Sequence, residues 1–125
     1  MEREPALNGN DEGARVLIVD DEPDLRHALS LLVESHGFEI AGEAGSGREA
    51  IDLASQDPPD VIVLDYMMPE MDGAEAAERL RSIAPNAKII AFSAILTDKP
   101  EWADAYLNKD RISQIGLVIK EATAT

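Results

Sequence analysis

From residue 15 onward, short apolar segments alternate with segments that have helical periodicity. Residues 16–19, 61–64 and 89–92 are continuous apolar runs. Such runs are typical of parallel strands covered on both faces, because every side chain then points into a buried layer. Residues 38–41 alternate between apolar and polar types, which predicts a strand nearer an edge of the sheet, and residues 105–107 form a weaker fifth candidate.

Four segments with helical periodicity lie after the first, second, third and fifth of these strands. The first begins near Pro23, a residue favoured in the first turn of a helix, and ends near Gly37. Ser46 and Asp72 are each followed three residues later by a glutamate, the spacing of a capping box, and Asp110 is a candidate cap for the last helix. We therefore expect helices to start at these positions.

The alternation of strands and helices predicts the α/β fold class, with a doubly wound, five-stranded parallel sheet. The flavodoxin-like strand order 2-1-3-4-5 is the leading topology for right-handed crossovers. If residues 104–108 form the fifth strand, only residues 94–103 remain to cross over from the fourth. A crossover with a full helix needs at least about 10–12 residues, so we predict a shortened or missing fourth helix, with Trp102 covering the exposed flank of the sheet.

The length of 125 residues corresponds to one domain. We assign residues 15–122 to this domain, residues 1–14 to a flexible N-terminal tail because they are polar and aperiodic, and residues 123–125 to a tail or linker stub. The chain contains no cysteine, which excludes a disulfide framework, a thiolate metal site and a cysteine nucleophile.

Acidic residues outnumber basic ones by 25 to 11, which gives a formal net charge of −14 at pH 7. This charge argues against nucleic acid as a direct partner, since neutralising phosphates requires a basic face. No apolar run approaches the length of a membrane span, and the first four residues do not resemble the start of a signal peptide. We therefore expect a cytoplasmic location and no membrane partner.

Polar side chains follow the predicted strands at their carboxyl ends. Asp20 and Asp21 follow the first strand, Asp65 the third, Ser93 the fourth and Lys109 the fifth. Each of them taken singly has an ordinary explanation, such as a turn residue, a helix-start carboxylate or a surface lysine. In open α/β sheets, however, ligands bind at the carboxyl ends of the strands beside the switch point in strand order. We therefore predict that these five side chains converge on one crevice.

The types of these residues indicate phosphoryl chemistry. Three carboxylates in one crevice repel one another, and Mg²⁺ relieves that repulsion while keeping positions for water and phosphate oxygens. A carboxylate can attack phosphorus to give an aspartyl phosphate, whose charge needs compensation. We predict Asp65 as the phosphoacceptor, Asp20 and Asp21 as the metal carriers, and Lys109 and Ser93 as the phosphoryl contacts.

Four segments of the chain resemble the receiver domains of two-component response regulators: residues 16–22, 63–73, 91–94 and 105–109. The resemblance covers about residues 15–122. It implies transfer of a phosphoryl group to Asp65 from a histidine kinase or a histidine phosphotransfer protein. It also implies a signalling domain that assists its own phosphorylation and dephosphorylation, rather than an ordinary enzyme. The output partner would be a downstream protein or a C-terminal output domain outside this chain.

The same resemblance assigns further roles. It implies that the backbone carbonyl of Met67 completes the Mg²⁺ ligands, and that Ser93 and Tyr106 form the switch that reads out phosphorylation. The sequence departs from the family in two places. Asp110 follows Lys109 where many members have proline, and the stretch between Ser93 and Lys109 is shorter than usual.

Two other functions remain open from the sequence. A pseudo-receiver would use the same fold only as a protein-binding module, without phosphorylation. A haloacid-dehalogenase-like phosphatase would also form an aspartyl phosphate, but that chemistry usually needs an Asp two residues after the nucleophile, where this chain has Met67. A flavin-binding function is excluded because no phosphate loop rich in Ser, Thr and Gly follows the first strand.

Overall fold

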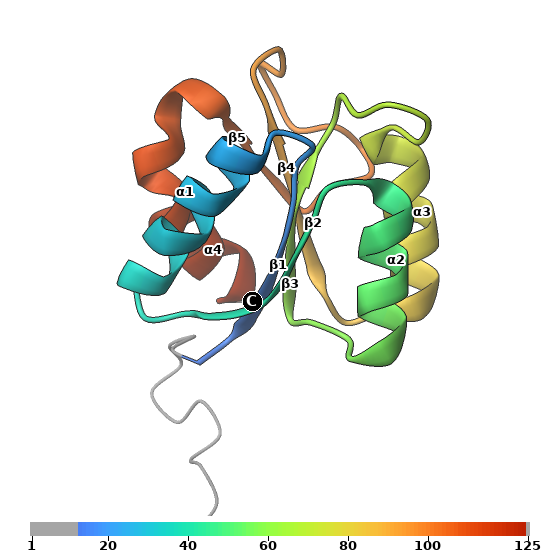
Figure 1. The fold of residues 1–125 in the computed structure, drawn as a ribbon. Helices are drawn as coiled ribbons and strands as arrows, with labels where there is room; N and C mark the ends of the chain where they lie inside the picture. The colour runs from blue at the N-terminus through green and yellow to red at the C-terminus, as the bar shows by residue number, and fades with distance from the viewer. Residues whose placement is uncertain (1–12, 125) are drawn as a thin grey trace, which may run out of the picture.

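The computed structural model of the protein describes residues 13–124. In this part of the chain, five strands form a single parallel sheet in the order β2-β1-β3-β4-β5 (Figure 1). The strands are β1 (Arg15–Val19), β2 (Glu39–Ala44), β3 (Val61–Asp65), β4 (Lys88–Ser93) and β5 (Ala105–Asn108). The predicted α/β class and strand order are therefore confirmed.

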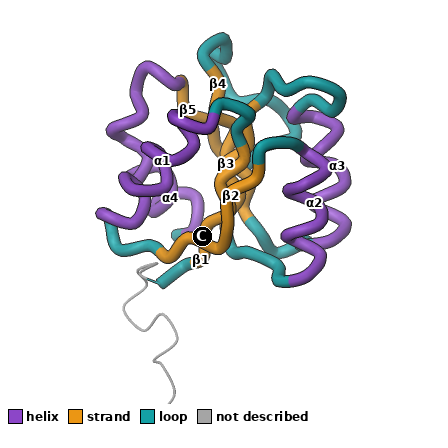
Figure 2. Tube along the Cα trace, in the orientation of Figure 1, coloured by secondary structure: helices purple, strands orange, loops and turns teal. Residues whose placement is uncertain are grey.

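The helices of the described residues cover the two faces of the sheet. They are α1 (Pro23–Ser35), α2 (Gly47–Gln56), α3 (Gly73–Ile83) and α4 (Ile115–Thr123). Helices α1 and α4 lie on one face, and α2 and α3 lie on the other, which gives the three layers visible in Figures 1 and 2. None of these helices is both long and apolar enough to cross a membrane.

The continuous apolar runs arise because successive side chains of a strand point to opposite faces of the sheet. In β1, Leu17 and Val19 pack in the apolar layer beneath α2 and α3, whereas Val16 and Ile18 pack in the layer beneath α1 and α4. All four side chains are at most 1% exposed. An unpaired polar group in either layer would be costly, so the ends of the strands are the favoured place for polar side chains.

The helix starts predicted at Pro23, Ser46 and Asp72 are confirmed. Helix α1 begins at Pro23. The Oγ of Ser46 accepts a hydrogen bond from the Glu49 backbone N–H at 3.1 Å. Likewise, Oδ1 of Asp72 accepts one from the Glu75 backbone N–H at 3.0 Å. These bonds satisfy donors that have no partner within the first helical turn.

The cap predicted at Asp110 is wrong. Asp110 lies inside the short 3₁₀ helix η1 (Lys109–Gln114), and α4 starts only at Ile115. Asn108 takes the capping role, because its Oδ1 accepts a hydrogen bond from the Asp110 backbone N–H at 2.9 Å. The chain therefore turns immediately after β5, before the α-helical periodicity begins.

The prediction of a shortened or missing fourth helix is confirmed, because no helix lies in the described residues between β4 and β5. Residues 94–104 contain only bends and one turn, in which the Ala103 N–H donates to the Pro100 carbonyl at 3.2 Å. Trp102 packs against the apolar layer beneath α2 and α3, which agrees with its predicted role. Its indole stacks on the ring of Tyr66, with 6.0 Å between the ring centroids. One aromatic side chain thus partly replaces the cover that a helix would provide.

Most of the predicted N-terminal tail lies outside the described residues, as does Thr125. The described part of that segment is Gly13 and Ala14, which form backbone hydrogen bonds with Gly37 and Glu39 at 3.2 and 2.9 Å. The tail and the linker stub therefore stay predictions.

The open connection between β4 and β5 has a measurable consequence. Without intrahelical hydrogen bonds, most backbone amides of residues 95–103 should exchange with solvent through openings of near-zero free energy. Hydrogen-exchange mass spectrometry or NMR should find them far less protected than the amides of α1. Protection in residues 95–103 equal to that of α1, with α3 as a second helical reference, would contradict this structure of the connection.

Candidate functional site

The carboxyl ends of the strands bring the predicted site residues to one edge of the sheet, the upper edge in Figure 1. Asp20 directly follows β1, Asp65 ends β3, Ser93 ends β4 and Lys109 follows β5. Asp20 is 0% exposed, and Asp65 and Ser93 are each 2% exposed. Asp20, Asp65 and Ser93 are therefore buried at this edge, whereas Asp21 is exposed.

Three carboxylates form a cluster at this edge. Asp20, Asp21 and Asp65 each offer one oxygen, and these oxygens all lie within 4.8 Å of one another. Asp20 Oδ1 accepts a hydrogen bond from the Glu22 backbone N–H at 2.9 Å. Its buried Oδ2 has no well-directed hydrogen bond from any described residue, although the Nζ of Lys109 lies 3.0 Å away. The Asp20 carboxylate thus has capacity for a further positive partner.

Lys109 is the cation that faces the buried carboxylates. Its Nζ lies 3.0 Å from Asp20 Oδ2 and 3.4 Å from Asp65 Oδ2. The same nitrogen sits 5.5 Å from the centroid of the Phe92 ring, a favourable distance for a cation–π contact. Burial by itself lowers the pKa of Lys109, but its close contact with Asp20 and the negative charges of Asp65 and Asp20 raise it overall. Lys109 therefore remains charged.

Asp65 is strained electrostatically. Burial, and then the negative charge of Asp20, raise its pKa from 3.8 to about 6. The charge of Lys109 and a hydrogen bond from the Met67 backbone N–H to Asp65 Oδ1, at 3.3 Å, lower the pKa but do not outweigh the first two causes. One ammonium group therefore leaves the carboxylate cluster with excess negative charge.

The loop after Asp65 is held in place by a close backbone crossing at Gly73. The Gly73 N–H donates to the Tyr66 carbonyl at 2.9 Å. A Cβ at this position would lie 2.9 Å from the Asp65 carbonyl oxygen and 2.9 Å from the Tyr66 Cα, so a side chain does not fit without a backbone shift. Met67 lies in this loop and is 59% exposed, and its role as a metal ligand stays a prediction.

The predicted switch residues lie on β4 and β5. Ser93 Oγ accepts a hydrogen bond from the Ile95 backbone N–H at 3.3 Å. The Tyr106 hydroxyl donates to the Thr97 carbonyl at 2.8 Å, and the residue is 36% exposed. Tyr106 therefore contacts the β4–β5 connection and is not part of the carboxylate cluster. Its role as a switch stays a prediction.

Asn108 is a residue of this region for which no role was predicted from the sequence. Its Nδ2 donates to the carbonyls of Ala94 and Leu96, both at 3.2 Å, while its Oδ1 caps η1. Asn108 thus fixes the start of the β4–β5 connection and the turn that carries Lys109. The only signal in the sequence was its place at a strand end, since its partners lie 12 and 14 residues away.

Comparison with known proteins agrees with this geometry. A family model for the response regulator receiver domain matches residues 16–111. The chain belongs to this family. The match contains Asp20, Asp21, Asp65, Ser93 and Lys109. It therefore spans the complete set of predicted site residues and both edges of the sheet.

The chain matches between 40% and 93% of the length of the three similar proteins described below. The chemotaxis protein CheY of Thermotoga maritima is 46% identical over 83 residues, which cover 66% of this chain and 69% of CheY. The transcriptional regulatory protein PdtaR of Mycobacterium tuberculosis is 44% identical over 81 residues, 63% of this chain but only 40% of PdtaR. The response regulator domain of Thermotoga maritima CheB superposes with a TM-score of 0.77 at 25% identity, over 89% of this chain and 93% of that domain.

Receiver domains bind Mg²⁺ in an acidic pocket, and the carboxylates of this receiver fit such an ion. All three acidic side chains of the cluster offer oxygen, which is the ligand type that Mg²⁺ prefers. The unsatisfied Oδ2 of Asp20 and the raised pKa of Asp65 both indicate negative charge that Lys109 does not balance. Asp20, Asp21 and Asp65 are therefore the side chains that would hold the metal.

A first prediction concerns Asp21, the exposed member of the cluster. Mg²⁺ should raise the melting temperature of the wild-type protein, by an amount equivalent to about 2.7 kcal/mol at 100 times the Kd. Asp21→Ala should lose most of this shift, and without metal it should melt at the wild-type temperature or higher because one repelling charge is gone. Differential scanning fluorimetry with and without Mg²⁺ measures both. The exposed Asp24→Ala is the matched control, and an unchanged Mg²⁺ response in Asp21→Ala would remove Asp21 from the site.

A second prediction follows from the raised pKa of Asp65. The folded, metal-free protein keeps a proton on Asp65 up to about pH 6, whereas the unfolded chain releases it near pH 3.8. The stability that Asp65 contributes is therefore present below pH 3.8 and is lost as the pH rises through about 6. Asp65→Asn, which resembles the protonated form, should gain stability over wild type across this window, by roughly 2–3 kcal/mol.

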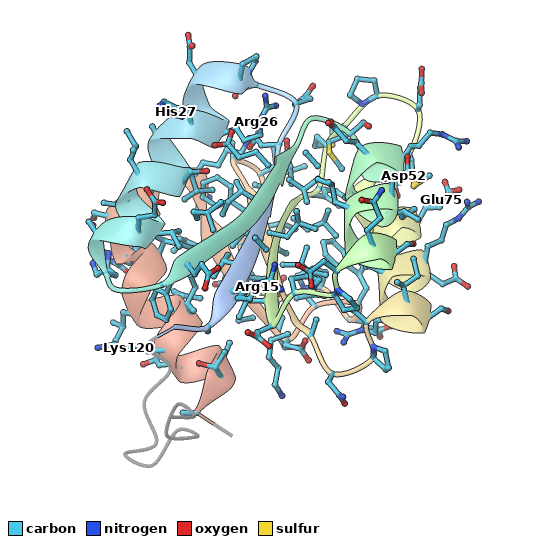
Figure 3. All side chains as sticks on the ribbon, turned by 60° about the horizontal axis from the view of Figure 1, so that its bottom comes forward. Arg15, Arg26, His27, Asp52, Glu75 and Lys120 are labelled. Carbon is cyan, nitrogen blue, oxygen red and sulfur yellow. The ribbon has the colours of Figure 1, made fainter. Side chains whose placement is uncertain are left out.

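Urea unfolding of the metal-free protein at several pH values measures this difference. The control is Asp52→Asn, since Asp52 lies exposed on α2, where Figure 3 labels it. That variant should follow the wild-type pH profile. Parallel profiles for Asp65→Asn and wild type between pH 4 and 8 would contradict the raised pKa.

Proposed function

We propose that the protein is a receiver domain that accepts a phosphoryl group on Asp65 in a Mg²⁺-dependent reaction. The observation that carries the proposal is the position of Asp65. It is buried at the end of the central strand β3, with its Oδ2 3.4 Å from the Nζ of Lys109 and with Asp20 and Asp21 beside it. A nucleophilic carboxylate next to a metal site and a fixed ammonium group is suited to phosphoryl transfer.

The donor is a phosphohistidine of a histidine kinase or a histidine phosphotransfer protein. An Asp65 carboxylate oxygen attacks the phosphorus, so that an O–P bond forms while the P–N bond of the donor breaks. The imidazole leaves with the bonding electron pair. Lys109 then moves from the carboxylates to a phosphoryl oxygen, where its ammonium group compensates the new charge.

When bound, Mg²⁺ supplies positive charge to the phosphoryl oxygens and relieves the repulsion among the carboxylates. Asp20, Asp21 and Asp65 would hold it with their side chains, and Met67 would contribute its backbone carbonyl. Support for this assignment comes from the Met67 backbone, whose N–H donates to Asp65 Oδ1 at 3.3 Å, whereas the residue as a whole is exposed.

Phosphorylation is read out through the β4–β5 connection. Ser93 exchanges its contact with the Ile95 N–H for a hydrogen bond to a phosphoryl oxygen. Tyr106 gives up its bond to the Thr97 carbonyl and changes rotamer. A phosphoryl group adds charge and strong hydrogen-bond acceptors, so a segment without helical hydrogen bonds can follow it.

The reshaped surface acts on a downstream protein or on an output domain outside this chain. The match to this chain covers only 40% of PdtaR, whose name describes it as a transcriptional regulatory protein. The receiver itself is not a turnover enzyme: it assists its own phosphorylation and dephosphorylation. Kinase and output partners are therefore the proteins to search for.

Labelling with a small phosphodonor tests the proposal. With acetyl phosphate and Mg²⁺, the wild-type protein should gain one phosphoryl group, measured by intact-protein mass spectrometry, because the attack breaks the P–O bond and releases acetate. Asp65→Asn should gain none, while the control Asp52→Asn should be labelled like wild type. Omission of Mg²⁺ should reduce labelling of both active proteins.

Three other results would contradict the proposal, and each has a different meaning. Stoichiometric label in Asp65→Asn would move the phosphoacceptor to another residue. An unlabelled, folded wild-type protein would favour a pseudo-receiver that only binds proteins. Continuous release of inorganic phosphate at high turnover would favour a phosphatase.

A further inference from the structure

Arg26, in the first part of α1, contacts two elements that meet beside the metal site. Its Nη1 donates to the backbone carbonyl of Asp20 at 2.8 Å. Its Nε donates to Oε1 of Glu43, in β2, at 3.1 Å. The Arg26 side chain is only 20% exposed and that of Glu43 30%. Figure 3 shows Arg26 between α1 and the sheet, so the guanidinium bridges the helix, the β1–α1 turn and β2.

The guanidinium helps to fix the turn that carries the metal carboxylates. The Asp20 backbone is held on one side by its N–H bond to the Ala44 carbonyl, at 3.0 Å, and on the other by Arg26 at its own carbonyl. Its side chain accepts from the Glu22 N–H, which closes the turn around Asp21. With these points fixed, the Asp20 backbone and one oxygen of its carboxylate are held in place before any ion binds. A preorganised site loses less conformational freedom when a ligand binds.

The shape of the guanidinium and one neighbour, Gly45, explain how Arg26 contacts both acceptors. A guanidinium is planar and presents several N–H groups in a fixed fork, so two donors reach two different acceptors at once. Gly45 leaves room for this fork, because a Cβ there would lie 3.1 Å from Nη1 of Arg26. A lysine at position 26 could reach only one acceptor well.

We infer that Arg26 is a positioning residue for the divalent cation, anchored by Glu43 and acting through the Asp20 backbone. The inference rests on the proposed Mg²⁺ site and adds to it a residue outside the carboxylate cluster. The effect on Mg²⁺ affinity expected from this role is opposite to the effect expected from the charge of Arg26 alone. A cation near a metal site disfavours metal binding by charge repulsion, so removal of Arg26 should tighten Mg²⁺ binding if only its charge matters. If Arg26 acts by position, removal weakens binding.

Isothermal titration calorimetry of the full chain with Mg²⁺ alone tests this, near pH 8 so that carboxylates are ionised. Arg26→Met keeps most of the apolar stem but loses the charge and both hydrogen bonds. Its Mg²⁺ Kd should rise by roughly 10- to 100-fold, the usual effect of losing a residue that orients metal ligands. Arg26→Lys keeps the charge and should still bind Mg²⁺ more weakly than wild type.

The matched control is Arg79→Met, since Arg79 is an exposed arginine paired with Glu75 at 3.3 Å on α3. It should bind Mg²⁺ like wild type. A second, charge-neutral variant is Gly45→Ala, whose Cβ would lie 3.1 Å from Nη1 of Arg26, so that the guanidinium must shift by a few tenths of an ångström. It should also weaken Mg²⁺ binding, and it tests the inference even if Arg26→Met does not fold, as judged by circular dichroism.

Unchanged or tighter Mg²⁺ binding in folded Arg26→Met, with normal binding by wild type, would overturn the role of Arg26 and leave the metal site intact. The same holds if Gly45→Ala binds like wild type. A lower melting temperature of Arg26→Met without a change in Kd would show a structural role only and would also overturn the inference. A wild-type protein that binds no Mg²⁺ would overturn the metal site itself, and the inference with it.

Discussion

Two buried carboxylates, Asp20 and Asp65, face one ammonium group, Lys109, and this imbalance of charge underlies the chemistry of the site. Burial and the charge of Asp20 raise the pKa of Asp65 to about 6, so the metal-free site carries negative charge at a cost in stability. Functional sites often keep a loss of stability of this kind. Here a bound cation would balance the negative charge and recover the lost stability. The carboxylates are therefore poised for ligands rather than for maximum stability of the empty fold.

The sheet determines where charged side chains can lie close together. Both faces of β1 and β3 are sealed by apolar layers, so charged side chains are confined to the strand ends, where loops and solvent meet them. Parallel pairing brings the ends of β1, β3, β4 and β5 to a single edge. Gly73 then lets the chain cross directly over Asp65 and Tyr66 without a side chain in the way. Which side chains lie together in the site thus depends more on the order of the strands than on the residues next to them in the sequence.

The connection between β4 and β5 depends on side chains rather than on a helix. At one end Asn108 holds the carbonyls of Ala94 and Leu96. At the other, Arg81 donates to the Trp102 carbonyl and to Asp104, both at 3.0 Å. A segment tied in this way can change shape by exchanging a few hydrogen bonds, without the cooperative melting of a helix.

The sequence by itself determined the five strands, the starts of three helices, the missing helix and the residues of the carboxylate cluster. These are local properties: alternation, capping spacing, segment length and the polar residue at each strand end. It failed at Asp110 and gave no role to Asn108 or Arg26, whose hydrogen bonds reach partners that only tertiary folding brings near. Side-chain contacts of this kind leave no periodic pattern in the chain. Whether an arginine reaches the backbone of Asp20 is decided by how α1 packs beside β2, and only the folded structure contains that information.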